Sequence, residues 1–327
     1  MEKPLKIRLH VLSPIHIGCD DVYEPTSFVI DEQKKKLIEF DPMDFVKGLT
    51  PQQRDEFSKL CSQDILLPIF KFVKRVVNQK INGRSIDIAG GLADHYKKAM
   101  DNKSSYSNKD IINQFYIQRT VYNPQDNQPY IPGTSLKGAF RTAYLSELAT
   151  VRKTEQFWIG SDLLSSQDLA NPEFVYKQIG RKGVAKKLEE KLLNGSFDSD
   201  PFRMVKISDL LPLENVNAKV VYAVNKKKEQ SDKATRAESG PPQILETILS
   251  EGIFEGTITI QMPEHGSGIK DPIKKEYFLK AAQRFYGTVL KDEEKSFQVI
   301  GVKNLSAHQY YSQFIDRFNK TAFLIRL

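Results

Sequence analysis

Apolar and polar residues alternate with period two in several short stretches, a pattern that predicts strands with one buried and one exposed face. In residues 4–12 one face carries Leu5, Ile7, Leu9 and Val11, and the other carries Lys6, Arg8 and His10. Residues 27–30 and 37–40 flank a polar turn and predict a hairpin. Further strands are predicted at 115–122, 202–212, 218–225 and 252–261.

Between these strands, apolar residues recur at helical spacing. Asp41 and Pro42 are typical of a helix start, with Asp41 as the N-cap and Pro42 in the first turn. Residues 65–77 predict an amphipathic helix. Further helices are predicted to open at Gly133 and directly after Asp271.

Polar segments interrupt this pattern. Asp20 and Asp21 predict a solvated acidic turn. Residues 226–243 contain too few apolar side chains to offset the entropy of ordering, so we predict a loop that stays mobile unless a partner orders it. The chain closes with a predicted helix over 310–318 and a predicted strand at 323–327.

Short antiparallel groups of strands, mixed with helices and without repeats or heptads, predict an α+β fold. The chain has 327 residues, enough for about two domains at roughly 100–200 residues each. Hydrophobic residues make up 40% of the chain and aromatic residues 10%. This content is enough to build packed cores, and it excludes a chain that is disordered throughout.

Composition also limits the chemistry. Cys19 and Cys61 cannot supply a cysteine zinc site or a disulfide framework, and the five histidines lack HExxH spacing. No apolar run approaches the roughly 18 residues of a membrane span, and no signal peptide precedes the first strand. We therefore expect a cytoplasmic protein with no cofactor and no metal. The 48 basic and 41 acidic residues give a net charge of +7, which favours anionic partners such as nucleic acid.

Residues 130–143, YIPGTSLKGAFRTA, form the most informative segment, a loop that leads into a helix. Thr134 or Ser135 is placed to cap the first helical amides. Lys137 and Arg141 are one turn apart and are predicted to share the face opposite the core. Amides, hydroxyls and cations at a helix start favour a phosphate ligand. The alternative is an amphipathic helix whose two cations are solvated.

This segment resembles the IPGSSLKGAIRT motif of the RAMP superfamily, which comprises RNA-binding subunits of type III CRISPR effector complexes. Residues 13–18, SPIHIG, resemble the N-terminal signature of that superfamily. Residues 202–209, FRMVKISD, resemble the first strand of its second domain. Within the superfamily, the pattern is most similar to the family of fifth Csm subunits, which cap the 3′ end of the guide RNA in type III-A complexes.

The resemblance implies two ferredoxin-like (RRM-like) domains, one at 1–200 with helical insertions and one at 201–327 without the terminal glycine-rich loop of RAMP proteins. It implies a non-catalytic subunit that holds the 3′ segment of a CRISPR guide RNA and supports its maturation and complex assembly. Neighbouring Csm RAMP backbone subunits, small subunits and host maturation nucleases are the implied protein partners. The residues expected to contact RNA are Gly133, Thr134, Ser135, Lys137, Arg141, His16, Arg181, Lys182, Lys226 and Lys227.

Other interpretations stay open. His16 could be the general base of a RAMP endoribonuclease that processes precursor guide RNA, or it could hydrogen-bond a loop or contact RNA. The chain could also bridge proteins without touching RNA. Asp20 and Asp21 could position RNA for a metal ion instead of forming a solvated turn. The basic runs 181–187 and 226–228 could follow an RNA backbone or be solvated.

Overall fold

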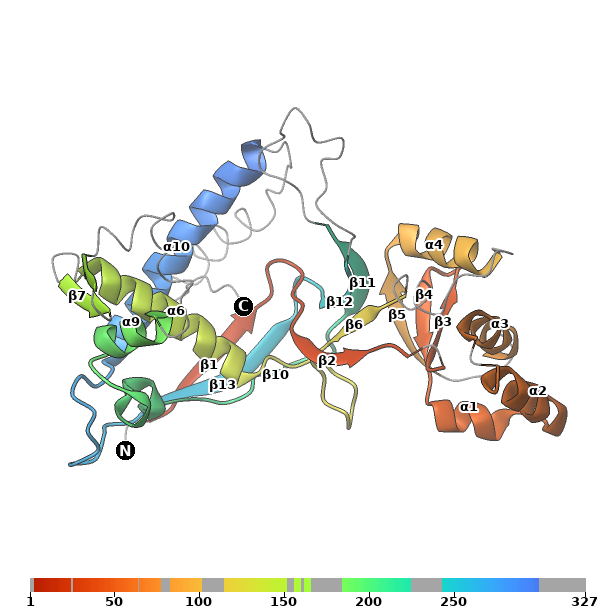
Figure 1. Ribbon diagram of the computed structural model, residues 1–327, viewed down its shortest axis with the longest axis horizontal. Coiled ribbons are helices and arrows are strands. Elements are labelled where there is room, and N and C mark those ends of the chain that lie inside the picture. Colours follow the sequence, from red (N-terminus) through yellow and green to blue (C-terminus); the bar gives the residue numbers. More distant parts are fainter. Residues whose placement is uncertain are drawn as a thin grey trace. The chain divides into compact units, whose positions relative to one another are not determined.

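A computed structural model describes residues 3–24, 26–63, 65–77, 83–101, 115–151, 156–159, 162–165, 184–224 and 243–299. The chain forms two compact units, each drawn from alternating segments (Figure 1). Unit 1 combines Met1–Leu12, Tyr130–Leu213 and Phe254–Leu327, and unit 2 combines Ser13–Pro129 and Glu214–Ile253. These units do not coincide with the two predicted domains, 1–200 and 201–327, because strands distant in sequence pair within each unit. The division into domains at residues 200 and 201 stays a prediction.

Unit 1 contains an antiparallel group of strands backed by helices. Strand β13 (Ile253–Ile260) is central, with β1 (Leu5–His10) on one side and with β9 (Val205–Ile207) and β10 (Leu211–Pro212) on the other. Helices α6 (Gly133–Val151) and α10 (Lys275–Val299) pack together, and the rings of Phe140 and Phe278 stack between them at 4.4 Å. The remaining elements are α9 (Val184–Leu192), the hairpin β7 (Gln156–Ile159) and β8 (Asp162–Ser165), and the 3-10 turns Phe197–Ser199 and Pro201–Met204.

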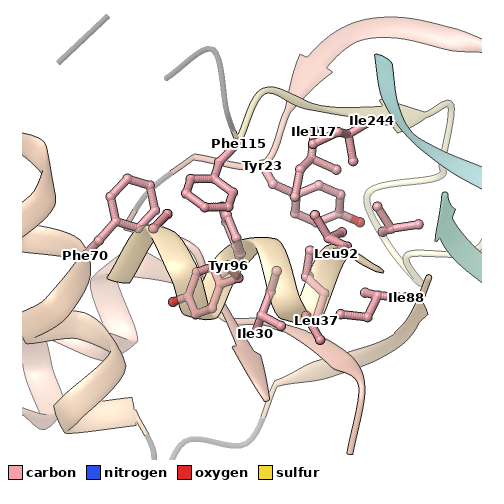
Figure 2. Close-up of a cluster of buried hydrophobic side chains, with 14 of the residues drawn as sticks. Tyr23, Ile30, Leu37, Phe70, Ile88, Leu92, Tyr96, Phe115, Ile117 and Ile244 are labelled. Carbon is pink, nitrogen blue, oxygen red and sulfur yellow. The ribbon is translucent and has the colours of Figure 1, made fainter. Parts of the chain in front are cut away.

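Unit 2 is built on a seven-stranded mixed sheet. Its spatial order is β2 (Gly18–Val22), β6 (Ile117–Thr120), β12 (Gln243–Ile248), β11 (Ala218–Ala223), β5 (Arg84–Ile88), β4 (Lys36–Glu39) and β3 (Phe28–Asp31). Its helices are α1 (Pro42–Gly48), α2 (Pro51–Cys61), α3 (Leu66–Val77) and α4 (Gly90–Asp101). The main core lies between this sheet and helices α3 and α4, where Phe70, Tyr96, Phe115 and Leu37 are buried (Figure 2).

The predicted α+β class is confirmed, and so are the strand at residues 4–12, the 27–40 hairpin, the Asp41 cap and the helix that opens at Gly133. Several predictions are wrong in detail. Asp20 and Asp21 do not form a separate turn; they lie in β2, where Asp20 takes a left-handed conformation (φ 59°). Helix α10 begins at Lys275 rather than after Asp271, and residues 202–204 start as a 3-10 turn.

Besides β2, the elements β5, α4, β7, β8 and β12 were not predicted. Residues 226–242 of the predicted loop at 226–243 lie outside the described residues, whereas Gln243 begins β12. The predicted helix over 310–318 and the predicted strand at 323–327 also lie outside the described residues. In the part of the chain that the structure describes, none of the helices combines the length and apolar character that crossing a membrane requires.

Candidate nucleic-acid interface

Helix α6 begins in the RAMP-like segment, and its start is held by residues from elsewhere in unit 1. The Gly133 amide donates a hydrogen bond to Asp209 Oδ1 at 2.8 Å. The amides of Ser135 and Leu136 donate to the Pro132 carbonyl at 3.0 and 3.2 Å. The cap is therefore Asp209, not the predicted hydroxyl of Thr134 or Ser135; a carboxylate at this position also interacts favourably with the helix dipole.

The two glycines of the segment occupy opposite environments. A Cβ on Gly133 would lie 2.3 Å from the Ile207 carbonyl oxygen, so the start of α6 approaches the end of β9 more closely than any side chain allows. A Cβ on Gly138 would meet nothing within 4 Å, and the residue is exposed. Gly133 is thus required by packing inside unit 1, whereas Gly138 leaves the surface of α6 open to a partner.

Arg141 is engaged within the protein. Its guanidinium contacts Glu189 Oε2 at 2.9 Å and Asp200 Oδ2 at 2.8 Å, and it lies 5.1 Å from the centre of the Phe202 ring. The alternative interpretation, in which both Lys137 and Arg141 are solvated, is therefore wrong for Arg141. In this arrangement the guanidinium joins α6 to α9 and to the turn before β9, and RNA would have to compete with two carboxylates for it.

Lys137 has a different environment. Helix α6 packs against β9, and among the charged groups Lys206 on that strand has the largest effect on the pKa of Lys137. Partial burial, followed by the positive charge of Lys206, lowers the pKa of Lys137, and Asp200 opposes this only in part. Neither lysine forms an ion pair with a described carboxylate. Two lysines so placed form a site that an anion would stabilise.

His16 lies in unit 2 and contacts the main chain. Its Nδ1 is 2.8 Å from the Glu246 carbonyl oxygen, so Nδ1 carries the hydrogen and donates. Of the interpretations open for His16, the geometry supports a histidine that hydrogen-bonds neighbouring main chain, since this bond joins the segment before β2 to β12. The contact of His16 with RNA stays a prediction.

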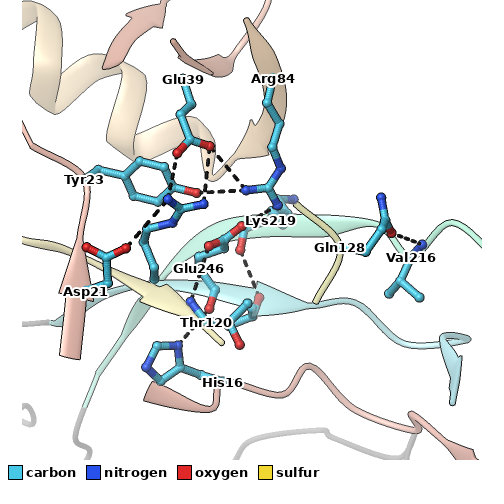
Figure 3. Close-up of polar contacts among 12 residues, drawn as sticks. His16, Asp21, Tyr23, Glu39, Arg84, Thr120, Gln128, Val216, Lys219 and Glu246 are labelled. Atoms are coloured by element: carbon cyan, nitrogen blue, oxygen red, sulfur yellow. Dashed lines mark hydrogen bonds and ion pairs between the residues drawn. The ribbon is translucent and has the colours of Figure 1, made fainter. Parts of the chain in front are cut away.

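A network of charged side chains in unit 2 was not predicted (Figure 3). Arg119 Nη1 lies 2.8 Å from Glu39 Oε1, and Arg84 Nη2 lies 2.8 Å from Glu246 Oε1. Glu246 is 1% exposed and also accepts from the Thr120 amide at 3.3 Å. Burial raises the pKa of Glu39, and the two guanidinium groups oppose that rise. The network links β4, β5, β6 and β12.

Asp21 belongs to the same network. It accepts from the Tyr122 hydroxyl at 3.1 Å and lies 3.7 Å from Arg119 Nη1, while the Arg119 guanidinium stacks 3.7 Å from the Tyr122 ring centre. Asp21 is therefore not simply a solvated turn residue. Within the described ranges, no group of three or more His, Cys, Asp or Glu side chains is arranged to hold a metal ion.

The remaining sequence-predicted RNA residues, Arg181, Lys182, Lys226 and Lys227, lie outside the described residues. The structure brings Gly133, Thr134, Ser135, Lys137 and Arg141 together at the start of α6.

One signal for the unit 2 network was visible in the sequence. Arg119 occupies an inward position between Ile117 and Val121, where an apolar residue is usual.

The chain matches the model of the RAMP superfamily over residues 8–319, and it belongs to that superfamily. A relative described as CRISPR system Cms protein Csm5, from Methanocaldococcus jannaschii, is 24% identical over 308 residues. That match covers 92% of this chain and 60% of the relative, so the chain spans about 60% of the length of the curated relative it matches.

Two solved structures have a similar fold. Csm5 of T. onnurineus superposes with a TM-score of 0.58 at 18% identity, covering 98% of this chain and 89% of that one. A chain in a Csm-crRNA-target RNA ternary complex of a type III-A CRISPR-Cas system superposes with a TM-score of 0.56 at 17% identity, covering 96% and 81%. The resemblance to the fifth Csm subunits and the RAMP ferredoxin-like fold class are therefore confirmed.

Proposed function

We propose that this protein is a non-catalytic RNA-binding subunit of a type III-A Csm complex, and that it holds the 3′ segment of the guide RNA. Its family membership and its Csm5 relative support the assignment to the complex. The observation that carries RNA binding is Lys137 on α6 together with Lys206 on β9, the strand that α6 packs against, with no described carboxylate in ion-pair contact with either lysine. Two cations on packed elements, each without an ion-pair partner among the described carboxylates, suit a phosphate of an RNA strand.

Recognition in this proposal is directed at the RNA backbone. Each guide carries a different spacer, so a subunit that contacted base edges at the 3′ segment would not serve all guides. Thr134 and Lys137 make the direct contacts at α6. The hydrogen bond of Gly133 to Asp209 and the ion pairs of Arg141 with Glu189 and Asp200 hold the start of α6 in position for these contacts. Ser135, His16 and the basic residues outside the described part complete the proposed set.

The test is to express the tagged full chain with its genomic neighbours, purify the complex and sequence the bound RNA. We expect guide RNAs, cross-linked to the α6 peptide through their 3′ segments. Lys137→Glu should reduce guide loading at least several-fold, and Lys280→Glu, an exposed α10 lysine, serves as the matched control. Equal loading by both variants would remove Lys137 from the site, and a complex without guide RNA would contradict the function.

The non-catalytic part of the proposal has its own test. Labelled repeat RNA is incubated with the purified full chain, with and without divalent metal. We expect the RNA to remain intact in both cases. Discrete products that disappear in His16→Ala would instead support the endoribonuclease alternative.

A further inference from the structure

The unit 1 sheet has two unlike faces. On one, Leu5 and Ile258 pack toward Phe278 of α10, and Phe254 and Val205 are buried. The other face carries alternate residues of the same strands. Its strand residues are Lys6, Arg8 and His10 from β1, Glu255, Thr257 and Thr259 from β13, Lys206 from β9 and Leu211 from β10. We call this the open face.

Charge on the open face is unbalanced. Lys6 Nζ lies 2.8 Å from Glu255 Oε1, and Arg8 Nε lies 2.9 Å from Glu255 Oε2, so two cations share one carboxylate. Their side chains remain 67% and 60% exposed in these pairs. Lys206 stands opposite Thr259, four residues further along β13. Among the described strand residues of this face, Glu255 is the only acid.

The layout fits a single RNA strand better than other anionic partners. Cations lie near both ends of a stretch of β13 from Glu255 to Thr259, which spans roughly 13 Å at about 3.3 Å per residue. Threonine hydroxyls lie between them and can contact phosphate or ribose. The described strand residues of this face include no Phe, Tyr or Trp on which bases could stack. The face therefore suits phosphates without regard to sequence.

We propose that the open face is a second RNA-backbone surface, in which Lys6, Arg8 and Lys206 bind phosphates and Glu255 limits the affinity by holding two of these cations. Phosphate groups would take over the bonds that Glu255 makes to Lys6 and Arg8 in the free protein. This inference rests on the proposed RNA-binding function. It extends the proposed site from Lys206, which also lies close to α6, across β13 to Lys6 and Arg8, and it assigns an opposing role to one carboxylate.

The experiment measures binding of a fluorescein-labelled, mixed-sequence single-stranded RNA to the full chain over a series of salt concentrations. Lys206→Gln, and Lys6→Gln combined with Arg8→Gln, should weaken binding and reduce the salt slope by about 0.7 for each phosphate that the variant no longer neutralises. Glu255→Gln should do the opposite and tighten binding. The matched control is Glu147→Gln, which also removes one acid paired with an arginine, Arg284, but in helices α6 and α10.

Opposite shifts for the Lys6→Gln and Arg8→Gln double variant and for Glu255→Gln, with Glu147→Gln near wild type, are the expected result. Equal tightening by Glu255→Gln and Glu147→Gln would mean that only net charge matters, and would overturn the inference. Cross-linking in the assembled complex separates the two proposals. Guide RNA that is present but not cross-linked to β1 or β13 contradicts the open face alone, because Lys206 of β9 also belongs to the proposed site at α6, and a complex without guide RNA contradicts the function as well. Loss of a partner subunit in Lys206→Gln with normal RNA loading would assign the face to protein contact instead.

Discussion

The carboxylate of Asp209 accepts a hydrogen bond from the amide of Gly133 at 2.8 Å, across 76 positions of sequence. The first amides of a helix have no partner within the helix, so this bond satisfies one of them with a charged acceptor at the positive end of the dipole. Ile131 and Leu210 exchange two main-chain hydrogen bonds nearby, at 3.0 and 2.8 Å. These three hydrogen bonds hold the RAMP-like segment against the connection between β9 and β10.

Replacing Asp209 tests this bond. Asp209→Ala should lower the free energy of unfolding by about 1–2 kcal/mol, because the buried Gly133 amide loses its acceptor. Asp209→Asn keeps an acceptor oxygen and should lower the free energy of unfolding by only about a few tenths of a kcal/mol. Urea denaturation of both variants measures the difference. Equal losses would mean that the charge, rather than the acceptor, makes the contribution.

The two glycines of the segment predict opposite effects for the same substitution. Gly133→Ala forces a methyl group against the Ile207 carbonyl and should destabilise the protein by about 3 kcal/mol or more. Gly138→Ala meets open space and should stabilise the exposed helix by up to about 1 kcal/mol. Thermal unfolding compares them. If Gly138→Ala folds well but loads less guide RNA, the added methyl group reduces loading by crowding the RNA at the surface of α6 and not by disturbing the fold.

Local signals predicted much of the fold. Asp41 caps α1, with its carboxylate accepting from the amides of Met43 and Asp44 at 2.7 and 3.0 Å, as Asp41-Pro42 indicates. Strand β13 follows its alternation over eight residues. These elements depend on neighbours within a few positions, so sequence patterns specify them.

Non-local partners explain what was missed. Strand β12, QILETI, was not predicted because Glu246 and Thr247 break its apolar run, yet both are buried. Burial of Glu246 depends on Arg84, 162 positions away, and no local pattern reports such a partner. The candidate site shows the same limit. Its motif located the start of α6, but the ion pairs of Arg141 and the proximity of Lys206 to Lys137 arise only from tertiary packing.

Glu246→Gln should be strongly destabilising. It removes the charge that compensates Arg84 at a site where the carboxylate is 1% exposed, and breaking a buried pair costs about 3–5 kcal/mol. The control is Glu56→Gln, which removes a surface partner of Arg75 and should cost at most about 1 kcal/mol. Chemical denaturation of the two variants gives the comparison. Similar small losses would show that solvent reaches the unit 2 network and screens it.

Lys137→Met should stabilise the RNA-free protein and weaken its RNA binding. Partial burial and the charge of Lys206 lower the pKa of Lys137 below its usual 10.5, so the charged form is disfavoured in the folded state. At neutral pH the side chain is charged in both the folded and the unfolded chain, and the full cost is present. As pH rises through the lowered folded pKa toward 10.5, the folded chain releases its proton first, and the cost disappears.

The gain in stability from Lys137→Met should therefore be within about 0.5 kcal/mol at neutral pH and should shrink as the pH approaches 10.5. In the same variant, the salt slope of RNA binding should fall by about 0.7. Thermal unfolding across pH, together with RNA titrations, checks both effects. A variant that is less stable at neutral pH and binds RNA as wild type does would show that Lys137 serves packing in unit 1. A variant that is more stable but binds RNA more weakly would instead show that the charge of Lys137 contributes to RNA binding and not to the stability of the fold.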